Sequence, residues 1–263
     1  MNSRRGAFRV AFVLCVTSMA DALAVTARAT APIAGQKPGT SGLRKKTREF
    51  MSENYLDNFV QSTFDALLEL SVSVKGGTLV ISGDGRFFNR QAIQVVAKIA
   101  VAAGVDRLWV GKDGLLSTPA VSAVIRSREG GLKAFGGFIL SASHNPGGID
   151  EDFGIKYNSE NGGPAAEKIT DVMLARTKAI TEIRSAASFP EIDISKVGTH
   201  TIASADGTRT VTVEVFDPTE DHVAVLRTCF DFEAIKALMA RPDFSMCYDS
   251  MHGVQGPYAK KVL

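Results

Sequence analysis

The sequence predicts an α/β fold in which a mixed, mostly parallel sheet is flanked by helices. Short apolar runs at residues 78–82, 107–110 and 137–140 have the length of buried strands. Longer segments with apolar residues three and four positions apart lie between these runs, as expected when helices join parallel strands. A glycine-containing loop follows each run, and sheets of this kind bind ligands beyond the carboxyl ends of their strands.

The elements of the first half follow from apolar spacing and from chain breakers. Residues 35–48 are expected to form a loop, because glycine and proline interrupt them and lysine and arginine follow. Residues 58–70 and 91–103 each predict a helix with one apolar face. The runs at 78–82 and 107–110 each end at a glycine and predict strands.

The second half continues the alternation. Residues 120–126 and 165–180 predict helices on either side of the third strand. The aspartate-glycine pair at 206–207 is a strong turn signal, so residues 199–205 and 208–216 predict a hairpin.

The pattern restarts near residue 215. Residues 230–239 predict a helix and residues 245–248 a strand. We therefore expect a first domain over residues 35–214 and the truncated start of a second, similar α/β domain over residues 215–263. The last residues follow a glycine-rich turn without a helix stop signal, which predicts an N-terminal fragment of a longer protein.

Residues 1–34 differ from the rest and are expected to be a leader. Arg4, Arg5 and Arg9 precede an apolar run at 10–16, and small residues follow, as in a secretory signal. The stretch is also nearly free of acidic residues, as transit peptides are. A disordered N-terminus is the alternative. The apolar run is too short to span a bilayer, which needs ~20 residues.

Composition excludes several classes of protein. Of the 263 residues, 45% are hydrophobic and 22% charged, which excludes collagen-like and wholly disordered chains. The net charge of +2 argues against a nucleic-acid binder. Cys15, Cys229 and Cys247 are too few and too scattered for a disulfide framework, so we expect reduced, mostly buried thiols.

The loop after the third strand carries the strongest chemical signal. Four polar residues precede a Pro-Gly-Gly turn: Ser141, Ser143, His144 and Asn145. Serine is a weak nucleophile unless a base, a metal or nearby cations activate it, and His144 and Lys156 are the candidates close in sequence. A loop that only turns the chain, with a capping serine, is the alternative.

A second signal lies in the loop at 35–48. It combines glycines, two hydroxyl groups and a cluster of cations: Gly39, Thr40, Ser41, Gly42, Arg44, Lys45 and Lys46. Backbone amides freed by glycine, together with hydroxyl groups and cations, form a cradle for an anion. A solvated basic turn is the alternative, and the spacing is not that of a Walker loop.

Together these loops resemble the phosphoglucomutase branch of the α-D-phosphohexomutase family. The matching motifs are K-P-G-T-S-G-L-R-K-K at 37–46, S-A-S-H-N-P-G-G at 141–148 and D-F-G-I-K-Y-N at 152–158. Stretches at 83–87, 111–119 and 249–258 support them. The resemblance runs from about residue 35 to residue 263, and it implies the fold of phosphohexomutase domain I.

The resemblance implies interconversion of glucose 1-phosphate and glucose 6-phosphate through glucose 1,6-bisphosphate and a phosphoserine at Ser143. It implies catalytic roles for Ser143, His144 and Lys156, with Lys156 favoured as the base, and substrate or phosphate binding by Thr40, Ser41, Arg44 and Asn145. It also implies Mg2+ bound to the phosphate on Ser143. Transfer of a phosphoryl group depends mainly on positioning and on neutralisation of charge.

Three family features have no counterpart in the sequence. These are the D-G-D-G-D-R loop with three aspartate ligands for Mg2+, the G-E-E-S-F-G sugar-binding loop and the C-terminal phosphate-binding domain. We therefore expect the fragment alone to be inactive. The alternatives are a non-catalytic phosphoprotein with this fold and a mutase for another hexose phosphate.

The family also implies the partners and the compartment. Its members act on small sugar phosphates as monomers, without nucleic acid or membrane, in the cytoplasm. A targeting function for residues 1–34 would instead direct the protein to a plastid or to the secretory pathway.

Overall fold

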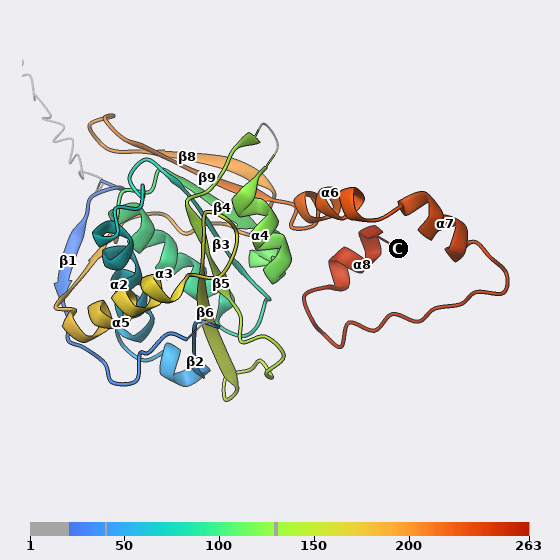
Figure 1. Ribbon diagram of the computed structural model, residues 1–263. Coiled ribbons are helices and arrows are strands. Elements are labelled where there is room, and N and C mark those ends of the chain that lie inside the picture. Colours follow the sequence, from blue (N-terminus) through green and yellow to red (C-terminus); the bar gives the residue numbers. More distant parts are fainter. Residues whose placement is uncertain (1–20, 40, 129–130, 263) are drawn as a thin grey trace, which may run out of the picture.

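The computed structural model describes residues 21–39, 41–128 and 131–262, and a seven-stranded sheet forms its centre (Figure 1). The strand order is β2-β6-β5-β3-β4-β9-β8. The strands are β2 (Leu43–Lys46), β3 (Thr78–Gly83), β4 (Arg107–Gly111), β5 (Gly136–Leu140), β6 (Asp152–Ser159), β8 (Gly198–Ala203) and β9 (Thr210–Phe216). The expected α/β fold is confirmed.

Parallel strands occupy the middle of the sheet. β5, β3, β4 and β9 are joined by parallel pairings, whereas β2, β6 and β8 add antiparallel pairings at the two edges. The expected hairpin is present as β8 and β9, and β9 continues the sheet beside β4. The loops that follow β3, β4 and β5 therefore lie at one edge of the sheet, where α/β proteins bind ligands.

Helices cover both faces of the sheet (Figure 1). α2 (Tyr55–Glu69), α3 (Asn89–Ala102) and α5 (Glu167–Ala179) lie on one face, and α4 (Thr118–Arg126) lies on the other. Successive residues of β3 point to opposite faces. Leu79 and Ile81 are buried in the cluster that contains α2 and α3, and Val80 is buried in the cluster that contains α4.

Short elements with few apolar residues were not expected from the sequence. The predicted loop at 35–48 contains β2 and continues into α1 (Thr47–Phe50), so a loop over this whole range is wrong. A short 3-10 helix, η1 (Lys112–Gly114), follows β4. Neither β2 nor α1 is long enough to show a periodic pattern of apolar residues.

A separate two-stranded sheet involves the segment that we expected to be a leader. β1 (Thr26–Ala29) pairs antiparallel with β7 (Glu182–Ser185), so these residues before position 35 are part of the fold. All four side chains of β1 are exposed, which explains why no apolar alternation revealed it. The arginines and the apolar run of the expected leader lie outside the described residues.

After β9 the chain leads away from the sheet (Figure 1). It forms α6 (Glu220–Cys229), α7 (Phe232–Met239) and α8 (Gly256–Val262). The strand expected at 245–248 is wrong, because these residues find no partner strand in the described chain to complete a hydrogen-bond ladder. Cys229 and Cys247 are exposed rather than buried, and Cys15 lies outside the described residues.

Among the residues that the structure describes, no helix combines the length and the apolar character needed to cross a membrane.

Candidate functional site

The pairing of β2 with β6 brings two cationic side chains to one face of the sheet. Arg44 lies directly opposite Gly154 in the antiparallel register. Lys156 follows Gly154 by two residues, and side chains two positions apart on a strand share a face. The register therefore places the Arg44 and Lys156 side chains as neighbours at the end of β5.

Ser143 lies beside these two cations. Its Oγ accepts a hydrogen bond of 2.8 Å from Nη2 of Arg44 and one of 3.1 Å from Nζ of Lys156. Gly154 permits this approach, because a Cβ at that position would lie only 2.4 Å from the carbonyl oxygen of Ser141. The loop that carries the serine consequently rests on the backbone of β6.

The loop holds Ser143 in an unusual backbone conformation. Its φ is 56°, in the left-handed region, which costs a residue other than glycine ~1–3 kcal/mol. The backbone N–H of Ser143 donates to Oγ of Ser141 at 3.0 Å, and Ser141 is buried. The N–H of Asn145 donates to the carbonyl of Ala142 at 3.2 Å. Ser141 thus shapes the turn that presents Ser143.

The electrostatics of this cluster favour an anion. Burial lowers the pKa of Lys156, and the positive charges of Arg44 and Arg86 lower this pKa further. Nε of Arg44 is buried and finds no hydrogen-bond partner among the described residues. Converging cations and a free guanidinium donor match the requirements of a phosphate group, which accepts several charge-assisted hydrogen bonds.

The other expected site residues lie around this cluster or outside it. Nδ2 of Asn145 donates to Asp152 at 2.7 Å, at the base of the loop. His144 and Ser41 are exposed, and the described contacts include no side-chain hydrogen bond of either. Thr40 lies outside the described residues. The structure therefore joins Arg44, Ser143 and Lys156 directly, and Asn145 through the loop.

The residues present do not by themselves fit Mg2+. This ion takes oxygen ligands, whereas the hydrogen-bond partners of Ser143 Oγ are the nitrogen atoms of Arg44 and Lys156. Within the described ranges, no three side chains of histidine, cysteine, aspartate or glutamate gather where they could hold a metal ion. Oxygen ligands would have to come from a phosphate and from residues elsewhere.

The sequence suggested no site role for two charged residues that lie against the serine loop, although both belong to the supporting stretch at 83–87. The guanidinium of Arg86 donates to both carboxylate oxygens of Asp84 and to backbone carbonyls of the loop. Their position in the sequence could have indicated such a role. An aspartate, a glycine and an arginine directly follow β3, at the edge of the sheet where ligands bind.

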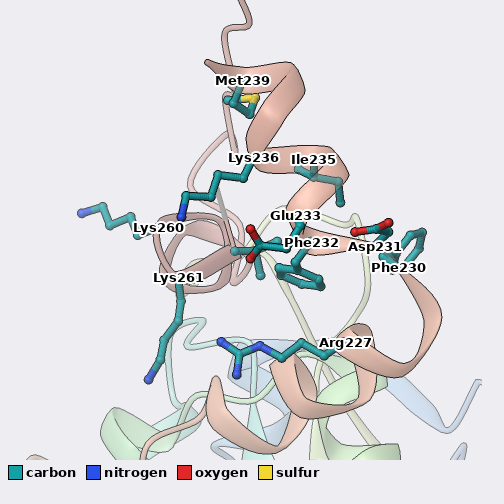
Figure 2. Close-up of a pocket in the computed structure, with 11 residues that line it drawn as sticks. Arg227, Phe230, Asp231, Phe232, Glu233, Ile235, Lys236, Met239, Lys260 and Lys261 are labelled. Atoms are coloured by element: carbon teal, nitrogen blue, oxygen red, sulfur yellow. The ribbon is translucent and has the colours of Figure 1, made fainter. Parts of the chain in front are cut away.

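A hollow of about 830 Å³ lies in a different part of the chain. Figure 2 shows Arg227, Lys236 and Lys260 around it, together with Glu233 and Phe232. Its lining comes from the segment after β9, whereas the cations around Ser143 come from β2 and β6. The hollow and the serine cluster are therefore separate features.

Comparison with known proteins links the serine cluster to a family. The family described as phosphoglucomutase/phosphomannomutase, alpha/beta/alpha domain I, matches residues 35–184, a range that contains Arg44, Ser143 and Lys156. The chain is 56% identical over 241 residues to the probable phosphoglucomutase, cytoplasmic 1, of Arabidopsis thaliana, and 55% identical over 241 residues to the cytoplasmic phosphoglucomutase of Bromus inermis. Each match covers 91% of this chain and 41% of the relative.

A solved structure agrees with these matches. The open form of the Paramecium exocytosis-sensitive phosphoprotein pp63/parafusin, a phosphoglucomutase, superposes with a TM-score of 0.83 at 43% identity. The match covers 90% of this chain and 42% of that one, so the chain spans about two fifths of the length of its relatives. The family match extends over more than half of the chain and includes the whole serine cluster. The chain therefore belongs to the phosphoglucomutase/phosphomannomutase family.

Proposed function

We propose that this chain carries the phosphoserine half of a phosphoglucomutase site, in which Ser143 exchanges a phosphoryl group with glucose phosphates. The observation that supports this most strongly is the pair of hydrogen bonds that Arg44 and Lys156 donate to Ser143 Oγ. The relatives at 56% and 55% identity are named phosphoglucomutases, which supports glucose phosphates as the substrates.

The first half of the reaction transfers the phosphoryl group to the sugar. O6 of glucose 1-phosphate forms a bond to the phosphorus on Ser143, and the bond between phosphorus and Oγ breaks. The proton that leaves O6 ends on Oγ, so glucose 1,6-bisphosphate and an unmodified serine result. Lys156, 3.1 Å from Oγ, is placed to deliver that proton.

The second half restores the phosphoserine. Oγ forms a bond to the phosphorus at C1 of the bisphosphate, the bond between that phosphorus and O1 breaks, and O1 takes up the proton that Oγ loses. Glucose 6-phosphate leaves. The lowered pKa of Lys156 supports a role as the base in this step, because more of the amine is unprotonated than in an exposed lysine.

The cationic side chains stabilise negative charge, and they take no part in the covalent bonds to phosphorus that form and break. Arg44 presents a planar guanidinium that suits two phosphate oxygens at once. Fixed positive charge close to a phosphoryl group lowers the energy of the transition state without any reorganisation during the reaction. We propose Mg2+ as a further source of charge neutralisation in the complete site, with ligands beyond those that the described residues supply.

A second candidate function is a phosphoprotein role without turnover. One relative of known structure is named an exocytosis-sensitive phosphoprotein as well as a phosphoglucomutase. Both functions need a phosphate on Ser143, but only the mutase needs that phosphate to exchange with a sugar. Exchange of label between the protein and glucose 1,6-bisphosphate separates the two.

We propose further that the 263-residue chain alone does not turn over glucose 1-phosphate. It spans about two fifths of its relatives, and the sugar-binding and aspartate loops of the family have no counterpart in its sequence. A coupled assay for glucose 6-phosphate tests this, and turnover at the rate of a complete phosphoglucomutase would overturn it. Following the names of the relatives, we also propose a cytoplasmic location.

Labelling of the serine tests the main proposal. In the complete enzyme, Ser143→Ala is expected to abolish incorporation of labelled phosphate from glucose 1,6-bisphosphate. Ser141→Ala is the control and is expected to retain incorporation, because the Ser141 hydroxyl supports the turn through the backbone N–H of Ser143 but does not carry the phosphoryl group. Equal incorporation into both variants would show that Ser143 is not the carrier.

A further inference from the structure

A largely buried ion pair lies directly behind the serine loop. The side chain of Arg86 is only 6% exposed and that of Asp84 16%. Nε of Arg86 donates to Oδ1 of Asp84 at 2.9 Å and Nη2 donates to Oδ2 at 2.8 Å, a two-pronged contact. The backbone N–H of Arg86 also donates to Oδ1 of Asp84, at 3.2 Å. Asp84 thereby fixes the plane of the guanidinium.

The remaining donors of this guanidinium hold the two ends of the serine loop. Nη2 of Arg86 donates to the carbonyl of Ser143 at 3.2 Å and lies 3.4 Å from the carbonyl of Asn145. Nη1 donates to the carbonyl of Asp152 at 2.7 Å. A single planar group therefore fixes the residue that carries the nucleophile and the first residue of β6.

This arrangement sets the distance between the two reacting groups. Lys156 lies on β6, four residues beyond Asp152, and strand geometry makes that spacing rigid. Ser143 lies in the loop at the other end of the same guanidinium. A shift of Arg86 would move Ser143 Oγ relative to Lys156 Nζ without removing either group.

The packing leaves little room for an alternative arrangement. A Cβ at Gly147 would lie 3.0 Å from Cβ of Arg86, so the far side of the loop rests on the arginine side chain. Lysine cannot replace this contact, because its ammonium is a single point, whereas a guanidinium presents five N–H donors in one plane. An Arg86 without Asp84 would be a buried charge without a partner.

We propose that Arg86, oriented by Asp84, is a positioning residue for phosphoryl transfer: it holds the Ser143 loop against β6 so that Oγ meets Arg44 and Lys156. The inference rests on the proposed function, because it explains how the serine that the proposed function phosphorylates is held in place. Arg86 touches neither Oγ nor the sugar in this account, and acts through the backbone carbonyls that it binds.

Arg86→Lys in the 263-residue chain tests the positioning directly. Hydrogen exchange of the loop amides is the first readout, because the N–H groups of Asn145 and Asp152 donate within the loop. Their exchange is expected to quicken by about tenfold or more, the factor for losing one hydrogen bond to a charged group. Arg90→Lys is the matched control, since Arg90 makes an exposed pair with Asp113, and it should leave loop exchange unchanged.

The rate at which glucose 1,6-bisphosphate phosphorylates Ser143 is the second readout, and a general loss of stability would not change it in the same way. With glucose 1,6-bisphosphate, the maximal rate at which Ser143 of the complete enzyme is phosphorylated is expected to fall about 100-fold in Arg86→Lys, as for a displacement of about 1 Å. The half-saturating concentration of the bisphosphate should stay as in the parent enzyme, because the groups that bind phosphate remain. Equal maximal rates in Arg86→Lys and Arg90→Lys would contradict the proposal.

Two parts of this design distinguish a failure of the proposed function from a failure of the positioning role. If the parent protein takes up no phosphate, the proposed function fails, while amide exchange still shows whether Arg86 holds the loop. If Arg86→Lys does not fold, Asp84→Asn takes its place, because it keeps the shape of the side chain and removes only its charge. Loop exchange in Asp84→Asn as slow as in Arg90→Lys would overturn the proposal.

Discussion

The part of the chain around Ser143 and the segment after β9 differ in how their side chains are supported. Around Ser143, apolar side chains are buried on both faces of the sheet, and polar side chains hold the loop. In the segment after β9, α7 has no buried residue, and Phe230, Leu238 and Met239 are exposed. Both regions form helices, but only the first provides a rigid support for reacting groups.

One arginine connects the two regions. The guanidinium of Arg128 lies 4.8 Å from the ring of Trp109 and 4.0 Å from that of Phe216. It also pairs with Glu214 of β9 and with Asp221 of α6. Stacking on the two rings and the charge pairs both hold the start of the C-terminal segment against the sheet. Beyond α6, Tyr258 is buried in the cluster that contains α4, and its hydroxyl accepts from the N–H of Ser117.

The largest effect should come from removing a core side chain. Phe138→Ala is expected to lower the free energy of unfolding by about 3–5 kcal/mol, because the ring is fully buried and leaves a cavity. Phe230→Ala, at a side chain that is 57% exposed, should change it by less than about 0.5 kcal/mol. Urea unfolding measures both. Similar losses would show that the C-terminal segment is packed as tightly as the sheet.

Next in size is the effect of an arginine at the serine. Arg44→Ala in the complete enzyme should slow phosphorylation of Ser143 by glucose 1,6-bisphosphate by about 10²–10³-fold, because it removes a fixed donor beside Ser143 Oγ, where the phosphoryl group is transferred. Arg227→Ala, at the hollow of the C-terminal segment, serves as the control. If Arg227→Ala slows the reaction as much as Arg44→Ala, the hollow is part of the reacting site.

A glycine substitution should have a smaller effect that again separates the regions. Gly154→Ala is expected to destabilise the fold by about 1–3 kcal/mol, because its Cβ would collide with the carbonyl of Ser141. Gly256→Ala should be neutral, since its Cβ would meet only Oγ of Ser250 at 3.4 Å. Thermal unfolding of the two variants compares them. A neutral Gly154→Ala would mean that the serine loop does not rest on β6.

The smallest effect is a difference between two lysine pKa values. Burial and nearby arginines lower the pKa of Lys156, whereas a hydrogen bond to Asp217 raises that of Lys261. Lys156 should therefore lose its proton at lower pH in an NMR titration of the lysine side chains.

The sign of the linked stability change follows from the same shift. Between the lowered pKa of Lys156 and 10.5, the unfolded chain binds the extra proton, so the contribution of this group to stability rises with pH in that window. A Lys156 that titrates with or above Lys261 would contradict this electrostatic account.

Long, periodic segments made the fold readable from the sequence. The apolar residues of α2 and α3 recur every three or four positions, and β3 and β5 are continuous apolar runs, so each was predicted within a few residues of its bounds. β1, β2 and β7 have four residues each, too few to show a period. The strand expected at 245–248 failed for another reason, since apolar residues do not form a strand without a neighbouring strand.

The sequence indicates which residues carry the chemistry of the site, but not which residues hold them in place. The serine loop and Arg44 were recognisable because reactive residue types cluster there with glycine and proline. The roles of Asp84 and Arg86 depend on contacts between the loop after β3 and residues about 60 positions away, which no local pattern contains. Gly154 likewise gains its role only from the approach of the Ser141 carbonyl.

Peptide mapping by mass spectrometry addresses the central claim most directly. The complete enzyme is incubated with glucose 1,6-bisphosphate, digested, and searched for a mass increase of one phosphate. We predict that increase on the peptide spanning residues 141–152, at Ser143, and, when the bisphosphate carries isotopically labelled phosphate, exchange of the label for unlabelled phosphate when glucose 1-phosphate is added. A peptide that stays unmodified, or a phosphate on Ser141 instead, would contradict it.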